Sequence, residues 1–450
     1  MSKTKEEYFE KLIEILKSDM DFHNFKSNYS SHNFHSFPAK FPPQLPQKFI
    51  LNLTSEGDVV LDPMVGSGTT VIEGFVNNRK AIGFDIDPLA LMITKVKTTI
   101  YNKNELITSF NRIMDDVSNL LLAPKSNIER LYDDFDLETQ KFIEYWFYEE
   151  TVRELLALSK SILKIAEENI RLFFQVIFSS IIITKTGGVS LALDLAHTRP
   201  HKAKKVYAPD ANLVFSQVRE NMGERYDTLV KKLRSPVNEF KKKFLQNVEC
   251  IVQSKSKFVP LIELSDSQNL PLKENSIDLI VTSPPYASNA IDYMRAHKFS
   301  LIWFGYNISD LKERRRDYIG GESISNYEFE TMPPKTIEVI QQIKKESKKK
   351  SLVLHRYYSE MQKVFKEIYR VLKPGKAAIV VIGNSIMNGV SSETHLCLKD
   401  IGESLGFIVP HIGVRNIDRN RRMMPATHRK YSSTILNRMN KEYIIGLYKE

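Results

Sequence analysis

The amino-acid sequence predicts an α/β protein that has a mainly parallel sheet, a terminal pair of antiparallel strands and a mostly helical insert. Residues 21–99 alternate strand-like and helix-like segments in β-α-β order, a pattern typical of parallel strands. Residues 258–306 and 351–450 contain further segments of both kinds. Between these blocks, residues 100–257 are largely helical in pattern and rich in Phe, Leu, Ile and Lys. We therefore expect one sheet domain that is interrupted by a helical segment.

The strands and helices of the sheet domain are predicted by short apolar runs. In the first block, DVVLDP predicts a buried strand, TTVIEGFVNN a helix and KAIGFDI a second strand. In the second block, FVPLIEL and IDLIVTS predict two further strands. In the third, YYSEMQKVFKEIYRVL predicts an amphipathic helix, because Met361, Phe365, Ile368 and Leu372 share one face. KAAIVVIGN then predicts a buried strand, and GFIVPHIGVRN and KEYIIGLYK predict the terminal pair.

The composition limits the class of protein. The chain has 450 residues, enough for two or three compact units, and a net charge of +10. That excess suits a polyanionic partner, although basic proteins without such a partner are common. The two cysteines, Cys250 and Cys397, support neither a disulfide framework nor a zinc site, which favours a reducing cytoplasm. The apolar run LFFQVIFSSIIITK is too short and too polar to span a bilayer, and it predicts a buried helix or strand.

A glycine turn follows the first strand. VVLDPMVGSGTT places Asp62 at the strand end, Gly66 and Gly68 in the turn and Thr69 at the start of a helix. Glycines let the backbone approach a ligand closely, and the free N–H groups of a helix start favour an anionic group. The third glycine of the dinucleotide fingerprint is replaced by Val71, and no P-loop lysine follows the turn. The turn therefore predicts a nucleoside ligand that carries a small anion.

A second acid supports that interpretation. Asp85 ends the next strand, in GFDIDP, where it could accept hydrogen bonds from both hydroxyls of a ribose. S-adenosylmethionine has a ribose, an adenine and a carboxylate, and Asp62 is placed for its ammonium or for holding the turn. The alternative is a plain β-turn-α connection. The acids at two successive strand ends count against that alternative.

The segment VTSPPY interrupts a strand abruptly. Pro284 and Pro285 have no N–H, so nearby carbonyls can point into a cleft without a ladder partner. The Ser283 hydroxyl and the Pro284 carbonyl could hold the hydrogens of an exocyclic amine, so that its lone pair faces a methyl sulfonium. Tyr286 offers a face on which an extruded base could stack. The alternative is a proline-rich turn after a buried strand.

Together these segments resemble the S-adenosylmethionine-dependent DNA amino-methyltransferases, which produce N4-methylcytosine or N6-methyladenine. DPMVGSGTT resembles motif I of that family, GFDIDP motif II and SPPY motif IV. LSDSQNLPLKENSIDLIVTSPPY resembles the joined motifs III and IV, and HSFPAKFPPQLPQKFI resembles motif X, which packs over the methionine end of the cofactor. IDYMRAHKFSLIWFG and VLKPGKAAIVVIGN extend the resemblance to about half of the chain. It implies a Rossmann-like methyltransferase sheet and a reaction on double-stranded DNA after base flipping.

The resemblance also implies the site residues and the domain organisation. The expected catalytic residues are Ser283, Pro284, Pro285 and Tyr286. The expected cofactor-binding residues are Pro38, Ala39, Lys40, Phe41, Asp62, Pro63, Gly66, Ser67, Gly68, Thr69, Asp85, Ile86 and Asp266. The expected segments are the first part of the catalytic domain with motifs X, I and II (1–99), a helical insert and candidate target-recognition region (100–257), a part with motifs III and IV (258–306), a charged insertion (307–350) and the end of the catalytic domain (351–450).

The target base is predicted from one position. Serine at the start of motif IV resembles the cytosine-N4 enzymes, whereas Asp or Asn is usual for adenine. We therefore expect cytosine N4, with adenine N6 and RNA amino-methylation as alternatives, and a catalytically silent nucleic-acid-binding protein as the non-enzyme alternative. Cytosine C5 chemistry is disfavoured because it needs a nucleophilic cysteine, and neither Cys250 nor Cys397 lies in a matching motif.

Two basic runs predict contacts with DNA phosphates. AHTRPHKAKKVY and RNIDRNRRMMPATHRKY concentrate Arg and Lys, which give affinity without specificity. The candidates are Arg199, Lys202, Lys204, Lys205, Arg419, Arg421 and Arg422. Solvated charged loops are the alternative. A cognate restriction endonuclease is a candidate partner, and an orphan epigenetic role fits equally. His35 and His297 flank the motifs and are interpreted as hydrogen-bonding or packing residues, and no metal-ligand spacing is present.

Overall fold

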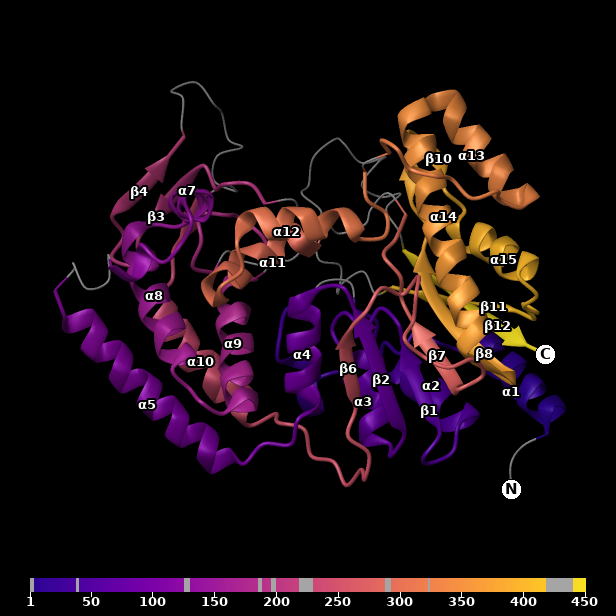
Figure 1. Cartoon of the computed structure of the whole chain (residues 1–450), viewed down its shortest axis with the longest axis horizontal. Coiled ribbons are helices and arrows are strands. Elements are labelled where there is room, and N and C mark those ends of the chain that lie inside the picture. The colour runs from indigo at the N-terminus through magenta and orange to yellow at the C-terminus, as the bar shows by residue number, and fades with distance from the viewer. Residues whose placement is uncertain are drawn as a thin grey trace.

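A computed structural model describes residues 4–37, 40–124, 130–184, 188–195, 200–217, 230–287, 293–322, 324–417 and 440–450. Figure 1 shows two regions side by side. One is a large sheet with its covering helices, which also carries both ends of the chain. The other is a helical layer that follows α4 (Pro88–Thr98).

The large sheet has seven strands in the order β11-β12-β8-β7-β1-β2-β6. Neighbours from β8 to β6 are parallel, and β12 is antiparallel to both β8 and β11. This arrangement confirms the predicted Rossmann-like α/β class and its terminal antiparallel pair. The strands are β1 (Val59–Asp62), β2 (Lys80–Asp85), β6 (Leu261–Leu264), β7 (Ile277–Thr282), β8 (Leu372–Gly383), β11 (Ile412–Asn416) and β12 (Lys441–Lys449).

Helices cover both faces of this sheet, which explains its apolar strands. All six residues of β7 are buried, as expected for a parallel strand between two helical layers. One face packs against α1 (Lys5–Lys17) and α2 (Gln44–Leu53). The other packs against α13 (Pro334–Glu346), α14 (Lys348–Val371) and α15 (Thr394–Ser404). Short pieces complete this region: α3 (Thr69–Val76), β9 (Ile386–Met387) and β10 (Val390–Ser391).

The segment between β2 and β6 is mostly helical, as predicted. Its long apolar run forms α9 (Glu168–Ile182), whose residues from Phe173 to Ile182 are all buried. Its other helices are α5 (Lys103–Leu122), α7 (Leu137–Trp146), α8 (Glu149–Leu163) and α10 (Pro236–Val248). It also holds a small sheet that sequence patterns did not predict, with strands β3 (Lys205–Tyr207), β4 (Leu213–Ser216) and β5 (Val230–Lys232). Strands of three or four residues are too short for a recognisable alternation of side chains.

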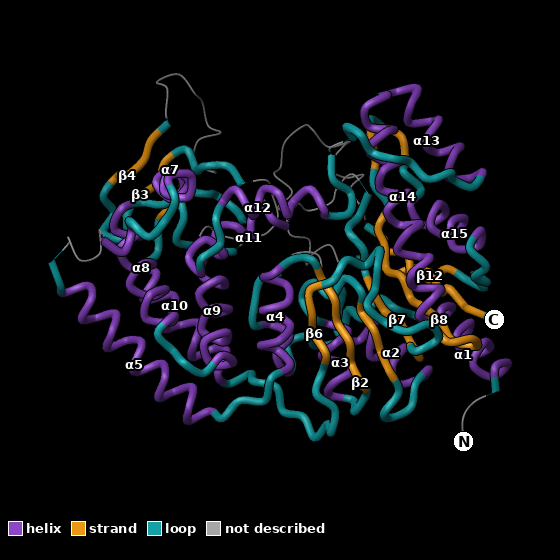
Figure 2. The backbone as a smooth tube through the Cα atoms, viewed as in Figure 1, coloured by secondary structure: helices purple, strands orange, loops and turns teal. Residues whose placement is uncertain are grey.

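The helical layer also contains residues from later in the chain. α11 (Tyr293–Leu301) and α12 (Ile308–Arg314) share one apolar core with α4, α5, α8, α9 and α10. Figure 2 shows these helices on one side of the molecule and the long strands on the other. The next helix after β7, α11, therefore belongs to the helical layer. Within the described residues, no helix is both long and apolar enough to cross a membrane.

Candidate active site

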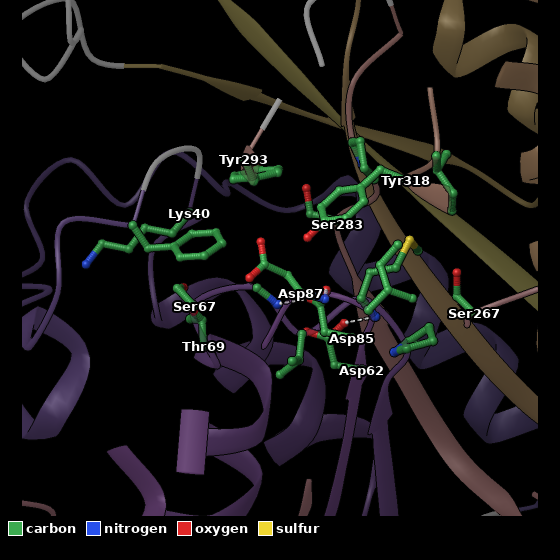
Figure 3. Close-up of a pocket in the computed structure, with 18 of the residues that line it drawn as sticks. Lys40, Asp62, Ser67, Thr69, Asp85, Asp87, Ser267, Ser283, Tyr293 and Tyr318 are labelled. Carbon is green, nitrogen blue, oxygen red and sulfur yellow. Dashed lines mark hydrogen bonds between the residues drawn. The ribbon is translucent and has the colours of Figure 1, made fainter. Parts of the chain in front are cut away.

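A pocket lies at the carboxyl ends of β1, β2, β6 and β7, the edge at which open α/β sheets bind ligands. The empty space is about 840 Å³, counted together with open solvent. Figure 3 shows Asp62, Asp85 and Asp87 together at its centre, with Ser283 and Tyr293 above them. The tertiary structure thus brings the glycine turn and the Ser-Pro-Pro segment to a single cavity.

Most of the predicted cofactor and catalytic residues line this pocket. They are Lys40, Phe41, Asp62, Pro63, Gly66, Ser67, Thr69, Asp85, Ile86, Asp266, Ser283 and Pro285. Gly68, Pro284 and Tyr286 are described but are not part of the lining. Pro38 and Ala39 lie outside the described residues.

The glycine turn is held by the second strand. Gly66 has a φ of +47°, and its N–H donates to Asp85 Oδ2 at 2.8 Å. Gly68 has a φ of +82° and caps α3. A Cβ on Gly68 would lie 2.8 Å from Thr94 Oγ1, so α3 and α4 approach too closely there for any larger residue. Both glycines are therefore required by backbone conformation, and Gly68 also by packing.

Replacing Gly68 with alanine is expected to lower the free energy of unfolding more than replacing Gly305. Both residues have positive φ, +82° and +92°, so a Cβ costs about 1–2 kcal/mol at either position. Only at Gly68 does the new methyl meet a neighbour, Thr94, because no described atom lies within 4 Å of a Cβ on Gly305. Denaturant unfolding of Gly68→Ala and Gly305→Ala measures the difference. Equal losses would contradict the close approach of α3 and α4.

Two acids at strand ends have perturbed proton affinities. Burial raises the pKa of the Asp62 carboxyl to about 6, although Thr282 Oγ1 donates to its Oδ1 at 2.7 Å. Burial also raises the pKa of Asp85 to about 7, and the nearby carboxylate of Asp87 adds to the rise. Groups of this kind, shifted by burial and by a like charge in a cleft, are typical of functional sites.

Several lining residues were missed by sequence reasoning. They are Phe37, Met64, Val65, Asp87, Ser265, Ser267, Tyr293, Tyr318 and Ile319. Asp87 had a local signal, because it follows Asp85 by two residues in GFDIDP. Tyr318 and Ile319 had none, since they come from the segment 307–350 that was predicted only as a charged insertion.

Tyr286 is oriented by the terminal strand pair. Its hydroxyl donates to Glu442 Oε1 at 3.0 Å, and the other oxygen of Glu442 accepts from Arg415. Burial, followed by the charge of Glu442, holds the pKa of Tyr286 well above its usual value, so the hydroxyl is a permanent donor. Glu442 is the second residue of β12, which is antiparallel and therefore starts at the edge where β7 ends.

The predicted DNA-binding residues fall in two places. Lys202, Lys204 and Lys205 lie at the small sheet of the helical layer, which Figure 1 shows at the far end of the molecule from α13 and α15. The Lys202 ammonium lies over the rings of Tyr145 and Phe215, 3.7 and 4.6 Å from their centroids. The candidates outside the described residues are Arg199, Arg419, Arg421 and Arg422.

The cysteines lie away from the pocket lining. Cys397 is buried in α15, and burial raises the pKa of its thiol to about 11, which disfavours the nucleophilic thiolate. Cys250 is half-buried and packs against the helical core. Within the described ranges, no group of three or more His, Cys, Asp or Glu side chains is arranged to hold a metal ion.

The fold and the pocket define an amino-methyltransferase class: a Rossmann-like sheet in which a glycine turn, an acid on the next strand and a Ser-Pro-Pro-Tyr segment share one edge. The chain belongs to the DNA methylase family, whose model (N6_N4_Mtase) matches residues 2–95 and 277–444. This match confirms the resemblance drawn from the motifs. It omits most of the helical layer.

Individual relatives match over most of the chain. It is 23% identical to the type II methyltransferase M.MvaI of Kocuria varians over 399 residues, 85% of this chain and 83% of the relative. It is 24% identical to M.BsoBI of Geobacillus stearothermophilus over 420 residues, 84% and 79% of the two chains. It is 24% identical to M.AvaI of Nostoc sp. over 428 residues, 86% and 82%. Matches that cover 84–86% of the chain must include part of the segment between β2 and β6.

Proposed function

We propose that this protein transfers a methyl group from S-adenosylmethionine to an exocyclic amine of a DNA base, most favourably cytosine N4, after the base is flipped out of the duplex. One observation carries the proposal: Asp62, Asp85 and Gly66 of the glycine turn line the same pocket as Ser283 and Pro285. A methyl donor and an amine acceptor must meet within a few ångströms, and a shared cavity provides that arrangement.

The residues of the pocket fit this cofactor. Asp85 stands at the end of β2 and is the candidate partner of the ribose hydroxyls. Asp62 presents a buried carboxylate suited to an ammonium, and burial raises its pKa to about 6. Asp266, exposed at the rim after β6, is the candidate for the adenine. The bound sulfonium would supply an electrophilic methyl group.

The Ser-Pro-Pro segment would act on the amine. The Ser283 hydroxyl and the Pro284 carbonyl would accept its two hydrogens and direct the nitrogen lone pair toward the methyl group. The two prolines keep this geometry rigid, so little reorganisation is needed when charge develops on the nitrogen. No strong base is required, because the methylated aminium is acidic and loses its proton afterwards.

The target and the partners follow from weaker signals. Serine at position 283 favours cytosine N4 over adenine N6. The relatives are named type II methyltransferases, which supports DNA over RNA and a cognate restriction endonuclease as a partner. We assign target recognition to the helical segment 100–257, and phosphate contacts to its lysines at the small sheet. A catalytically silent protein is disfavoured, because both motifs are intact.

Parallel assays with labelled S-adenosylmethionine test the proposal on DNA and on tRNA. We expect transfer to DNA, and nucleoside mass spectrometry of that DNA should show N4-methylcytosine. If N6-methyladenine is found instead, the target base is adenine and not cytosine. If only tRNA is methylated, the substrate is RNA and not DNA. Cofactor binding without transfer to either polymer would leave only the silent alternative.

Cofactor affinity is expected to rise with pH. Because the pKa of Asp85 is raised to about 7, its carboxyl is mostly protonated at about pH 6 and mostly ionised at about pH 8. Two ribose hydroxyls bind best to the ionised carboxylate. The affinity for S-adenosylmethionine should therefore increase from about pH 6 to about pH 8 and then become constant. The stability of the free protein should change in the opposite direction. An acid whose pKa is raised in the folded state lowers the free energy of unfolding as the pH rises toward 7. Calorimetric titrations at several pH values measure the slope. Asp85→Asn should remove its part near pH 7, while the ionisation of Asp62, whose pKa is raised to about 6, contributes at lower pH.

A further inference from the structure

A buried histidine–aspartate pair joins the pocket lining, through Asp87, to α11. His297, on α11, is 0% exposed, and its Nδ1 lies 2.5 Å from Asp87 Oδ2. Asp87 Oδ1 caps α4 by accepting the N–H groups of Leu89 and Ala90 at 2.8 and 3.3 Å. Burial alone would raise the pKa of Asp87, but the pair with His297 keeps it below its ordinary value. Both carboxylate oxygens are therefore occupied within the protein, which makes Asp87 a supporting group.

Asp87 in turn fixes the acid that faces the cofactor. The Asp87 N–H donates to Asp85 Oδ1 at 2.9 Å, while the Gly66 N–H donates to the other oxygen at 2.8 Å. Asp85 is thus held by hydrogen bonds from Gly66 on one side and from Asp87 on the other, and Asp87 is in turn held by His297. A displacement of Asp87 would change the direction in which the Asp85 carboxylate points.

The His297 ring also supports two aromatic side chains of the pocket. Phe37 and Tyr293 stack with their centroids 5.1 Å apart and an interplanar angle of 22°. The imidazole lies 5.4 Å from the Phe37 ring and 5.8 Å from the Tyr293 ring. Phe37 packs onto the glycine turn, because a Cβ on Gly66 would lie 3.3 Å from its ring. One imidazole therefore contacts both rings of this stack.

His297 is itself fixed from the helical layer. Ser300 Oγ donates to the His297 carbonyl at 3.1 Å, and Ser179 Oγ donates to Ser300 Oγ at 3.0 Å. His35 Nε2 lies 3.0 Å from the same Ser179 hydroxyl. All four residues are at most 2% exposed. This buried chain joins α9 to α11 and then, through the imidazole, to the pocket.

We infer that His297 is a positioning residue of the cofactor site, whose N–H holds Asp87 behind Asp85 and whose ring supports the Phe37–Tyr293 stack. This inference rests on the proposed function, because it names S-adenosylmethionine as the ligand. His297 does not line the pocket, so it acts through its neighbours. Its substitution is expected to weaken cofactor binding while DNA binding is retained.

Two substitutions separate the hydrogen bond from the ring. His297→Phe keeps an aromatic ring beside Phe37 and Tyr293 but loses the donor to Asp87. His297→Asn keeps an N–H near the position of Nδ1 but loses most of the ring contacts. Calorimetry with S-adenosylmethionine, without DNA, is expected to show at least about a tenfold rise in Kd for His297→Phe, since a hydrogen bond to a charged group is lost. His297→Asn should recover part of that loss.

A double-mutant cycle and a matched control complete the test. Asp87→Asn keeps the helix cap and removes the charge, so adding His297→Phe to it should raise Kd by less than in the wild-type background. His355→Phe is the control, because His355, on α14, makes a hydrogen bond to the Glu330 carbonyl and is not part of the pocket lining. It should leave Kd unchanged. The KM for DNA should stay constant in every variant.

The outcomes are distinct. The positioning role is supported if Kd rises for the cofactor but not for DNA, and if the effects of His297→Phe and Asp87→Asn on that Kd are not additive. Wild-type Kd in folded His297→Phe and His297→Asn overturns it, and so does a parallel loss of cofactor binding, DNA binding and melting temperature in both variants. Failure of the wild-type chain itself to bind S-adenosylmethionine would overturn the proposed function, and the inference with it, before any variant is compared.

Discussion

Replacing Tyr286 with alanine is expected to reduce kcat for methyl transfer by about tenfold to a hundredfold, the usual contribution of one stacked base. DNA affinity should be largely retained, because phosphate contacts dominate it. The structure gives the tyrosine a defined orientation, since its hydroxyl donates to Glu442 at the start of β12. Without that ring, a flipped base would lose the surface that holds it against Ser283. Single-turnover assays and DNA titrations measure the two quantities.

Tyr286→Phe is the matched control. It keeps the aromatic face and removes only the hydrogen bond to Glu442, so kcat should fall by less than about tenfold. Ser283→Ala removes one proposed acceptor of the amine and should again reduce kcat while DNA remains bound. If both Tyr286→Ala and Ser283→Ala methylate DNA at the wild-type rate, the Ser-Pro-Pro-Tyr segment is not part of the catalytic site.

Asp62→Asn is expected to weaken S-adenosylmethionine binding by about tenfold to a hundredfold, the effect of losing a hydrogen bond to a charged group. The substitution keeps an oxygen that can accept from Thr282 Oγ1 at 2.7 Å and from the Met64 N–H at 3.2 Å. The turn should therefore persist. Stability at pH 7 should be equal to or above that of the wild type, because a buried carboxylate with a raised pKa is removed. Calorimetry and denaturant unfolding report the two effects.

Thr282→Val distinguishes the two roles considered for Asp62. The residue is fully buried, and valine removes its hydroxyl without changing its shape. If Asp62 mainly binds the ammonium, Thr282→Val should lower stability by about 1 kcal/mol and change cofactor affinity little. If Asp62 mainly holds the turn, Asp62→Asn would leave affinity unchanged, and that result would contradict the ammonium contact.

The sequence predicted the sheet well, because β7 is fully buried, β8 and β12 are long, and β1 and β2 end in recognisable turns. The runs around β1, β2, β7 and β8 combine β-branched residues with glycine or proline at their ends. The terminal pair β11 and β12 was also predicted correctly. The small sheet of β3, β4 and β5 was missed, because strands this short are stabilised by their partners and carry little local pattern.

The pocket was predictable only in part, for a different reason. Residues next to motifs, such as Asp62, Asp85 and Ser283, could be named because one turn or strand end defines their position. Tyr318 could not, because its place depends on how α12 and the following turn return from the helical layer to the sheet. His297 was visible only as a histidine beside a motif, and its partner Asp87 lies 210 residues away.

Local chemistry could therefore be read from the chain. The strand segments along the chain, the glycine turn, the acids at strand ends and the Ser-Pro-Pro-Tyr segment depend on neighbours within a few residues. Together they identified the family. Contacts between distant segments were decided by the tertiary structure alone. The Asp87–His297 pair, the Phe37–Tyr293 stack and the Tyr286–Glu442 hydrogen bond form only when the helical layer and the terminal strands pack against the sheet. Packing against distant residues has no local pattern, so no short stretch of sequence could reveal it.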